Sequence, residues 1–304
     1  MRKEFSSAIE KYSLSNEKII FLTGDLGFMA LENVAASLQN RFINMGVSEQ
    51  NMIAAAAGLA SEGLIPVCYS IAPFAVFRPA EQIRLDVCLH NMNVKIVGNG
   101  GGYGYGIMGA THHSIEDIAV MSAFQNMKCY IPFCNEDVDN IVYNMLNSEG
   151  PAYLRLGFGN KPDSAALTEY RPVRKISEGT YATIIGVGPV LLNVFDALKL
   201  AGLKKSGADL FVISEMPVLE LSEELLESIK KTKKILIIEE HVKRGGLGEN
   251  LSLLLMEKNI NCKFTHLFAK GYPDGLYGSQ KFHQKTNGLD SSNIALRLKE
   301  LANE

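Results

Sequence analysis

The residues with the clearest chemical potential begin at Glu49. Asn44 and Gly46 form a turn before Ser48, a typical helix N-cap, and residues 49–63 then have the small apolar side chains of a buried helix. Glu49 therefore lies in a first helical turn, where the helix dipole favours a carboxylate. Because the small side chains predict that this helix is buried on most sides, we expect the acid to have a specific partner. An ordinary first-turn acid is the alternative interpretation.

A second stretch with chemical potential is the run from Gly98 to Gly109, which has seven glycines in twelve positions. This composition predicts a loop whose backbone approaches another group closely. The run continues into Thr111-His112-His113-Ser114 and contains no Gly-Lys-Ser/Thr, so it is neither a dinucleotide fingerprint nor a Walker loop. The two histidines either open a site or form an exposed pair in a turn.

Composition excludes several classes of function. The net charge is −3 and no basic patch stands out, which argues against nucleic-acid binding. No segment reaches about 18 uninterrupted apolar residues and the N-terminal stretch lacks the apolar run of a signal peptide, so we expect a cytoplasmic protein without a membrane span. The five cysteines are an odd number without metal-ligand spacing, which predicts reduced thiols.

Short apolar runs alternate with helical patterns along the whole chain of 304 residues. This alternation predicts an α/β protein of two doubly wound domains, each a mostly parallel sheet with helices on both faces. We expect a first domain over 1–160, a linker over 161–178 and a second domain over 179–304. The expected strands are 18–23, 41–44, 65–70, 94–98, 129–132, 151–156, 181–187, 208–213, 234–239 and 262–267.

The helical patterns cover the segments between these strands. The expected helices are 2–12, 49–63, 78–91, 115–124, 137–146, 189–202, 222–231, 248–258 and 290–302. In the helix over 78–91, we expect Ile83, Val87 and Leu89 to face inward. Ser114 and Asp117 would form a capping box for the helix over 115–124.

Three motifs occur in a specific order. They are Met45-Gly-Val-Ser-Glu-Gln50, Arg78-Pro-Ala-Glu-Gln-Ile-Arg84 and Gly109-Ala-Thr-His-His-Ser-Ile-Glu-Asp-Ile-Ala119. In this combination the sequence resembles the C-terminal half of a transketolase, and also deoxyxylulose-phosphate synthases and the β-chains of 2-oxoacid dehydrogenases. The resemblance covers nearly the full chain. It implies a pyrimidine-binding domain, then the C-terminal domain of the family, and thiamine diphosphate as the coenzyme.

The resemblance also implies roles at the coenzyme. Glu49 matches the acid that hydrogen-bonds N1′ of the aminopyrimidine and so favours the imino tautomer, whose 4′-nitrogen deprotonates C2 of the thiazolium. Phe74 matches the ring that stacks on the pyrimidine, with Phe77 beside it, and ordinary core packing is the alternative for both. Ile71 stands where many relatives have another aromatic residue.

On the substrate side, His112 matches a histidine that moves protons or holds a developing alkoxide. His113 and Tyr105 are further candidates for substrate contact. Phosphosugar-specific relatives have an Asp at the position of Met108. They also have cations near Gly100, Gly101 and Phe158, so Arg155 alone remains as an expected anion contact. We therefore expect a larger, modified or differently charged acceptor instead of a simple aldose phosphate.

The family binds the diphosphate and its metal through a Gly-Asp-Gly run, and Gly24-Asp25-Leu26-Gly27 does not match that motif. We expect the N-terminal, diphosphate-binding transketolase subunit as a partner that carries Mg²⁺ or Ca²⁺. The expected assembly is α2β2, with self-association across a dimer interface.

The hypothesis is a split-gene transketolase-like subunit that transfers a two-carbon ketol unit from a ketose donor to a sugar aldehyde or ketone acceptor. One alternative is the β-chain of a 2-oxoacid dehydrogenase or decarboxylating synthase, and the histidine pair favours transfer over it. Another is a non-catalytic α/β binding paralogue. Glu49 and His112 argue against that alternative, because a site without chemistry has no need of a costly buried acid.

Overall fold

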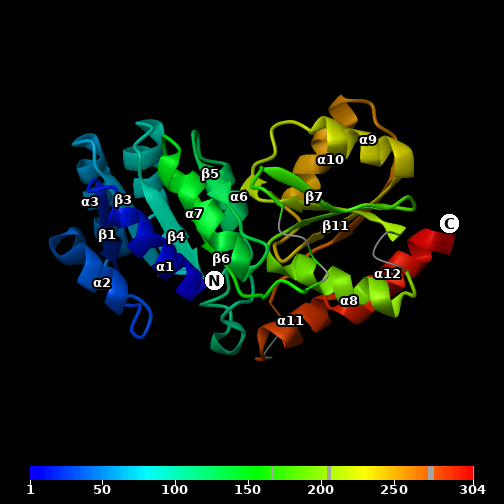
Figure 1. Ribbon diagram of the computed structural model, residues 1–304, viewed down its shortest axis with the longest axis horizontal. Helices are drawn as coiled ribbons and strands as arrows, with labels where there is room; N and C mark the ends of the chain where they lie inside the picture. The colour runs from blue at the N-terminus through cyan, green and yellow to red at the C-terminus, as the bar shows by residue number, and fades with distance from the viewer. Residues whose placement is uncertain (164, 166–167, 204–206, 273–276, 304) are drawn as a thin grey trace.

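The computed structural model describes residues 1–163, 165, 168–203, 207–272 and 277–303. Two mostly parallel sheets, of seven and five strands, lie side by side with helices on both faces of each (Figure 1). The predicted fold class is therefore confirmed. Within the described part of the chain, no helix combines the length and apolar character needed to cross a bilayer. The five cysteines are free thiols, four of them buried.

The first sheet has the strand order β10-β5-β6-β4-β3-β1-β2, and all pairs are parallel except β10 with β5. Strands β1 and β6 are mostly apolar and buried along their whole length, as expected for parallel strands between helical layers. The strands of this sheet contributed by the first half of the chain are β1 Ile19–Thr23, β2 Phe42–Asn44, β3 Ile65–Ile71, β4 Lys95–Asn99, β5 Lys128–Tyr130 and β6 Ala152–Leu156.

Helices cover this sheet in two layers. One layer packs its apolar residues into the core that contains Phe5, Val34 and Ile141, and it consists of α1 Arg2–Ser13, α2 Glu32–Leu38 and α7 Val138–Asn147. The opposite layer consists of α3 Glu49–Ser61, α4 Ala72–Val76, α5 Ala80–Gln82, the π-helix η2 Ile83–Leu89 and α6 Asp117–Ser122. The 3₁₀ turns are η1 Gln39–Arg41, η3 Gly106–Met108 and η4 Asn135–Asp137.

Three local predictions for these helices are wrong. Leu89 is 58% exposed, because the wider π-helical turn changes which positions share a face, although Ile83 and Val87 are buried as predicted. Asp117 pairs with Arg155 instead of capping α6. In the single chain α3 is not buried on most sides, since Ala54 is exposed.

The second sheet has the order β12-β11-β8-β9-β7, with β7 antiparallel to β9. Its strands are β7 Val173–Ser177, β8 Thr183–Val187, β9 Asp209–Ile213, β11 Lys234–Glu239 and β12 Lys263–Leu267. Its helical segments are η5 Pro189–Leu191, α8 Leu192–Leu200, α9 Glu223–Thr232, α10 Leu247–Glu257, α11 Gln280–Asn287 and α12 Ser291–Asn303.

The segment 161–178, which we expected to be a linker, also contains β7, and this strand forms an edge of the second sheet. Residues 164, 166 and 167 of that segment lie outside the described residues. The domain boundaries at 160 and 179 stay a prediction.

The two sheets are joined by strand pairing and by buried charge. The strand β10, Glu215–Met216, follows β9 of the second sheet but pairs with β5 of the first. Arg155 Nε donates to Asp117 Oδ2 at 2.9 Å, and Arg155 Nη2 donates to the carbonyl oxygen of Glu240 at 3.0 Å. Because Arg155 is 4% exposed, its charge depends on these partners, and they hold the two sheets together.

We predict that Arg155→Met lowers the free energy of unfolding by about 3–5 kcal/mol, because it leaves Asp117 buried without its cation. Chemical denaturation of the variant measures this loss. The control is Lys199→Met, which removes the exposed pair between Lys199 and Asp196 and should leave the midpoint almost unchanged. Equal small shifts for both variants would show that the buried pair does not hold the sheets together.

Candidate functional site

Glu49 is buried and has the specific side-chain partners that the sequence predicts for a buried acid. It begins α3, with Ser48 as the N-cap, and its side chain is 3% exposed. Oε1 accepts from Ser70 Oγ of β3 at 3.2 Å, and Oε2 lies 2.9 Å from Arg78 Nη1. The carboxyl end of β3 therefore places one hydroxyl on the acid and the segment after α4 places one cation there, which satisfies the buried charge.

An aromatic ring lies next to this acid. Phe74 belongs to α4, which follows β3 directly, and the guanidinium carbon of Arg78 lies 3.9 Å from the centre of its ring. Arg78 thus contacts the face of Phe74 and the carboxylate of Glu49 at once, so a planar donor group fits between them. Phe77 is 39% exposed and Ile71 is half-buried at the end of β3.

His112 faces the same ring from the glycine-rich loop. The rings of His112 and Phe74 meet edge to face with centroids 5.2 Å apart. Thr111 Oγ1 lies 2.9 Å from His112 Nδ1. Tyr105 is 6.1 Å from His112 between ring centroids, and its hydroxyl accepts from Asn99 Nδ2 at 2.6 Å. The structure therefore brings Glu49, Phe74, His112 and Tyr105 into one continuous set of contacts.

Two other predicted residues point elsewhere. His113 is 2% exposed, and its Nε2 lies 3.1 Å from the carbonyl oxygen of Gly106. Burial lowers the pKa of His113. Arg155 uses Nε for Asp117 and Nη2 for two carbonyl groups, so these two nitrogens are already bonded within the chain. Both residues support the loop, and their contact with substrate stays a prediction. Met108 lies on η3 and is 51% exposed.

The structure supplies cations that the sequence did not suggest. A pocket of about 490 Å³ beside Tyr105 and Gly100 is lined by Arg2 and Lys3 from the start of α1, together with Asn99, Phe158 and Gln280. Glu4 and Met1 also line it, and Glu4 pairs with the amino group of Met1. Nothing in the spacing signals this arrangement, because the cations lie about a hundred positions before the loop. Arg2 and Lys3 of α1 therefore supply, beside Gly100 and Phe158, the positive charge that we expected to be missing there.

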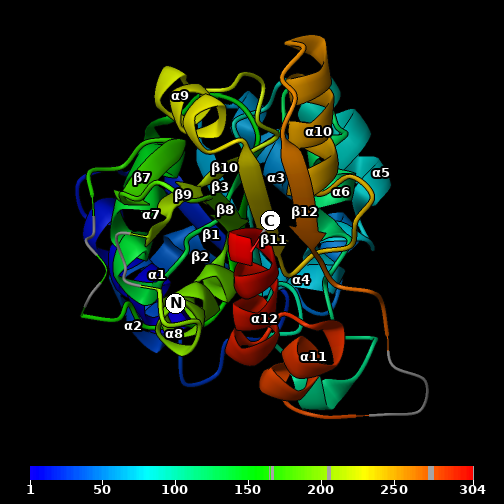
Figure 2. The ribbon, with the colours of Figure 1, turned by 90° about the vertical axis from the view of Figure 1, so that its right-hand side faces the viewer.

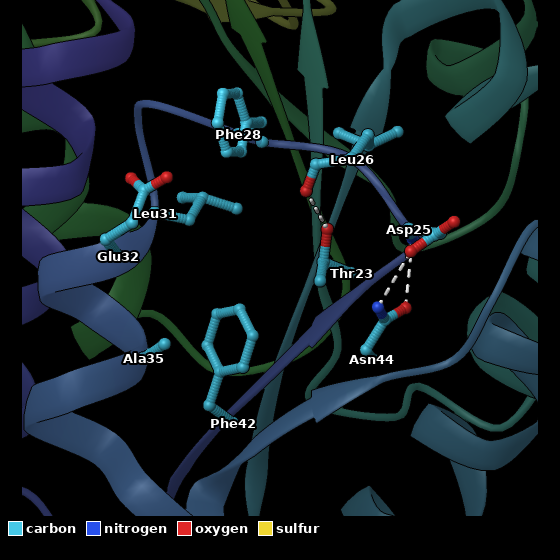
Figure 3. A pocket seen from close by; sticks show the side chains of 10 residues that line it. Thr23, Asp25, Leu26, Phe28, Leu31, Glu32, Ala35, Phe42 and Asn44 are labelled. Carbon is cyan, nitrogen blue, oxygen red and sulfur yellow. Dashed lines mark hydrogen bonds between the residues drawn. The ribbon is translucent and has the colours of Figure 1, made fainter.

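A second pocket, of about 300 Å³, opens at the carboxyl ends of β1 and β2 (Figure 3). Asn44 closes the turn after β1, since its Oδ1 accepts from the backbone N–H of Asp25 at 3.1 Å and its Nδ2 donates to Asp25 Oδ1 at 3.0 Å. Among the residues that the structure describes, no lysine or arginine lines this pocket. Within the same ranges, no group of three histidines, cysteines or carboxylates is placed to hold a metal ion.

These side chains fit one half of a thiamine coenzyme. A buried carboxylate with an adjacent aromatic face can hold an aminopyrimidine by a hydrogen bond and by stacking. A diphosphate needs cations or a metal, and the described lining of the pocket in Figure 3 offers neither.

Known proteins resemble this chain over nearly its whole length. Residues 1–162 match the family model for the transketolase pyrimidine-binding domain, and residues 172–290 match that for the transketolase C-terminal domain. One subunit of an apulose-4-phosphate transketolase, from Actinobacillus succinogenes, is 32% identical over 84% of this chain and 83% of its own length. The protein of the same name from Phocaeicola vulgatus is 31% identical over 96% of this chain and 94% of its own length.

A solved structure agrees with these matches. It is that of a split gene transketolase in an inactive beta4 tetramer, and it superposes with a TM-score of 0.83 at 27% identity, covering 99% of this chain and 97% of that one. The three motifs, the two matched domains and the shared fold lead to one conclusion: this chain belongs to the transketolase family.

Proposed function

We propose that this chain is the pyrimidine-binding subunit of a thiamine diphosphate-dependent enzyme that transfers a two-carbon ketol unit from a ketose donor to a sugar aldehyde or ketone acceptor. The observation that carries the proposal is the buried carboxylate of Glu49 beside the face of Phe74, with His112 at the edge of the same ring. Family membership supports the cofactor class and the role as a subunit.

Thiamine diphosphate, when bound, supplies the carbon atom at which a carbon–carbon bond of the ketose is broken and remade. Glu49 would hold a proton against a ring nitrogen through Oε2, while Ser70 fixes Oε1. Arg78 already makes the two contacts that we propose for the aminopyrimidine, stacking on Phe74 and bonding to Glu49. The coenzyme ring would therefore replace the guanidinium of Arg78 between these two groups.

His112 and its neighbours would handle the sugar. The imidazole lies between Phe74 and Tyr105, on the side of the site reached from the glycine-rich loop. From there it can hold or move a proton at a hydroxyl or carbonyl oxygen of a substrate. Tyr105, held by Asn99, limits the position of the imidazole ring.

An anionic end of the acceptor would lie in the pocket beside Tyr105. Arg2 and Lys3 line that pocket, and charge-assisted hydrogen bonds from these groups are strong and favour a phosphate. The relatives named for apulose-4-phosphate support a phosphorylated sugar. We therefore replace the expectation of an unusual acceptor, which rested on missing cations, by a phosphorylated acceptor held from α1.

A partner subunit would complete the coenzyme site. In the segments that follow β1 and β2, Phe28 is 85% exposed, Met29 is 79% exposed and Val47 is 72% exposed, and exposed large apolar side chains are typical of binding surfaces. We propose that the N-terminal transketolase subunit covers these segments and brings the diphosphate with Mg²⁺ or Ca²⁺. The assembly would be α2β2 in the cytoplasm, and the tetrameric β relative supports self-association.

The first prediction concerns the acid. In the complex reconstituted with the partner subunit, Glu49→Gln should lower turnover of a ketose donor by about a hundredfold or more, because the amide cannot share a proton with the ring. Steady-state assays measure this loss, with Glu62→Gln at the exposed end of α3 as the control. Unchanged turnover would favour the non-catalytic paralogue, and release of CO₂ from an oxoacid would favour the decarboxylating alternative.

The second prediction concerns the division of the coenzyme between subunits. Titration calorimetry of this chain alone should detect negligible binding of thiamine diphosphate with Mg²⁺, because the described residues that line the pocket at β1 and β2 include no cation. Binding should appear when the partner subunit is added. Tight binding to the isolated chain would contradict a site completed by the partner.

The third prediction concerns the acceptor. Exchanging Arg2 and Lys3 for Gln should raise the KM of a phosphorylated acceptor by about tenfold or more, since two charge-assisted contacts are lost. The KM of the same sugar without phosphate should not change. Lys11→Gln, at the other end of α1, is the matched control because it pairs with Asp139 away from the pocket. Equal effects on both sugars would refute the anion subsite.

A further inference from the structure

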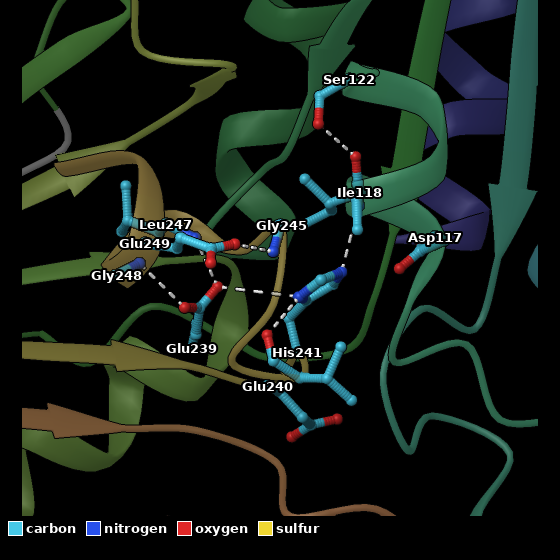
Figure 4. Close-up of polar contacts among 12 residues, drawn as sticks. Asp117, Ile118, Ser122, Glu239, Glu240, His241, Gly245, Leu247, Gly248 and Glu249 are labelled. Carbon is cyan, nitrogen blue, oxygen red and sulfur yellow. Dashed lines mark hydrogen bonds and ion pairs between the residues drawn. The ribbon is translucent and has the colours of Figure 1, made fainter. Parts of the chain in front are cut away.

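The glycine-rich loop is held from the second half of the chain. We call residues 98–113 the substrate loop, since they carry Tyr105 and His112. Glu240 follows β11, between Glu239 and His241 (Figure 4), and is 4% exposed. Its Oε1 accepts from the backbone N–H of Tyr103 at 2.7 Å. A Cβ atom at Gly102, where φ is +66°, would lie 2.3 Å from that oxygen. Only glycine at 102 therefore lets the loop rest on Glu240.

A helix of the same half reinforces this contact. In α11, Gln280 Nε2 donates to Glu240 Oε1 at 2.9 Å and Gln284 Nε2 donates to Oε2, so both carboxylate oxygens are fixed. The turn η3 of the loop lies against α11 (Figure 2). The approach is close, because a Cβ atom at Gly106 would lie 2.5 Å from the backbone nitrogen of Gln280.

Two histidines bind one carbonyl group of the loop. The oxygen of Gly106 lies 3.3 Å from His283 Nε2 of α11 and 3.1 Å from His113 Nε2 of the loop. Since a carbonyl accepts, each ring carries its proton on Nε2. Tyr103 stacks on His283 at 4.9 Å between centroids, and its hydroxyl donates to the carbonyl oxygen of Gly271 at 2.5 Å. The loop is thus anchored at Tyr103 and at Gly106.

A loop with seven glycines has many conformations of similar energy, so its ordered shape depends on such anchors. Tyr105 lies between the two anchored residues, and His112 is adjacent to His113. Reacting groups lose rate steeply when they are misplaced by about 1 Å. None of the anchoring hydrogen bonds involves Glu49 or Phe74, whose contacts come from β3, from the segment after α4 and from the loop itself.

We propose that Glu240 and His283 are positioning residues, by which the C-terminal half of the chain sets the place of Tyr105 and His112 in the active site. The proposal rests on the proposed function for its catalytic consequence. It gives the second sheet and α11 a task in the reaction, although neither contacts Glu49 or Phe74.

Hydrogen exchange of the full chain tests the anchoring without any assay of activity. Glu240→Gln removes one of the two carboxylate acceptors, and His283→Phe keeps the ring against Tyr103 but removes the donor to Gly106. Both should speed exchange of the loop amides, such as that of Tyr103, by about tenfold or more. Unchanged exchange in the loop of both variants would overturn the proposal.

A matched control lies next in the sequence. Glu239 is also fully buried, but it accepts from the backbone N–H groups of Leu247 and Gly248 and bonds to His266, not to the loop. Glu239→Gln should therefore speed exchange at the start of α10 and leave the substrate loop unchanged. Faster exchange of the loop in this control as well would point to general loosening and contradict specific anchoring.

The reconstituted complex tests the consequence for catalysis. In Glu240→Gln and His283→Phe, the KM of the acceptor should rise and kcat should fall, while the affinity for thiamine diphosphate stays unchanged. Glu240→Ala should cause a larger effect than Glu240→Gln, because it keeps no acceptor. An equal loss of coenzyme affinity would overturn the positioning role. If even the wild-type complex shows no ketol transfer, the proposed function fails, and the exchange experiment still decides the anchoring.

Discussion

The structure depends on a carboxylate that is buried where a helix begins. Removing Glu49 from water is unfavourable unless its oxygens are bonded, and the fold supplies Ser70 from β3 and Arg78 from the segment after α4. Both partners reach the acid because α3 packs against β3, and because α4 and the segment with Arg78 follow the carboxyl end of that strand. Val47, two residues before the acid, is 72% exposed, so the acid lies next to apolar surface that a partner subunit would cover.

The second half of the chain completes the site indirectly. Its strand β10 extends the first sheet, and Arg155 connects Asp117 to the carbonyl oxygen of Glu240. The side chain of Glu240 then supports the glycine-rich loop. One continuous set of buried polar contacts thus runs from the second sheet to the loop that carries His112, and it lies beside an apolar core that the two halves share.

Periodicity and motifs predict much of this molecule. The alternation of apolar runs and helical patterns predicts two parallel sheets, and the position of Glu49 after Ser48 predicts a first-turn acid with a partner. Other features depend on tertiary contacts that no local pattern encodes. The π-helical turn exposes Leu89. The strand β7 joins the second sheet by pairing with β9. Arg2, in the first turn of α1, lines the pocket beside Tyr105. Asp117 has the residue type and spacing of a capping residue, but it pairs with Arg155, which is distant in the sequence.

One structure determination can test whether the coenzyme ring replaces Arg78 between Glu49 and Phe74, because Arg78 now contacts both groups. A crystal structure of this chain with the diphosphate-binding subunit and thiamine diphosphate should place the pyrimidine ring between Glu49 and Phe74, with the guanidinium of Arg78 moved off the ring of Phe74. A coenzyme bound elsewhere, with Glu49 still paired to Arg78 over Phe74, would contradict the account.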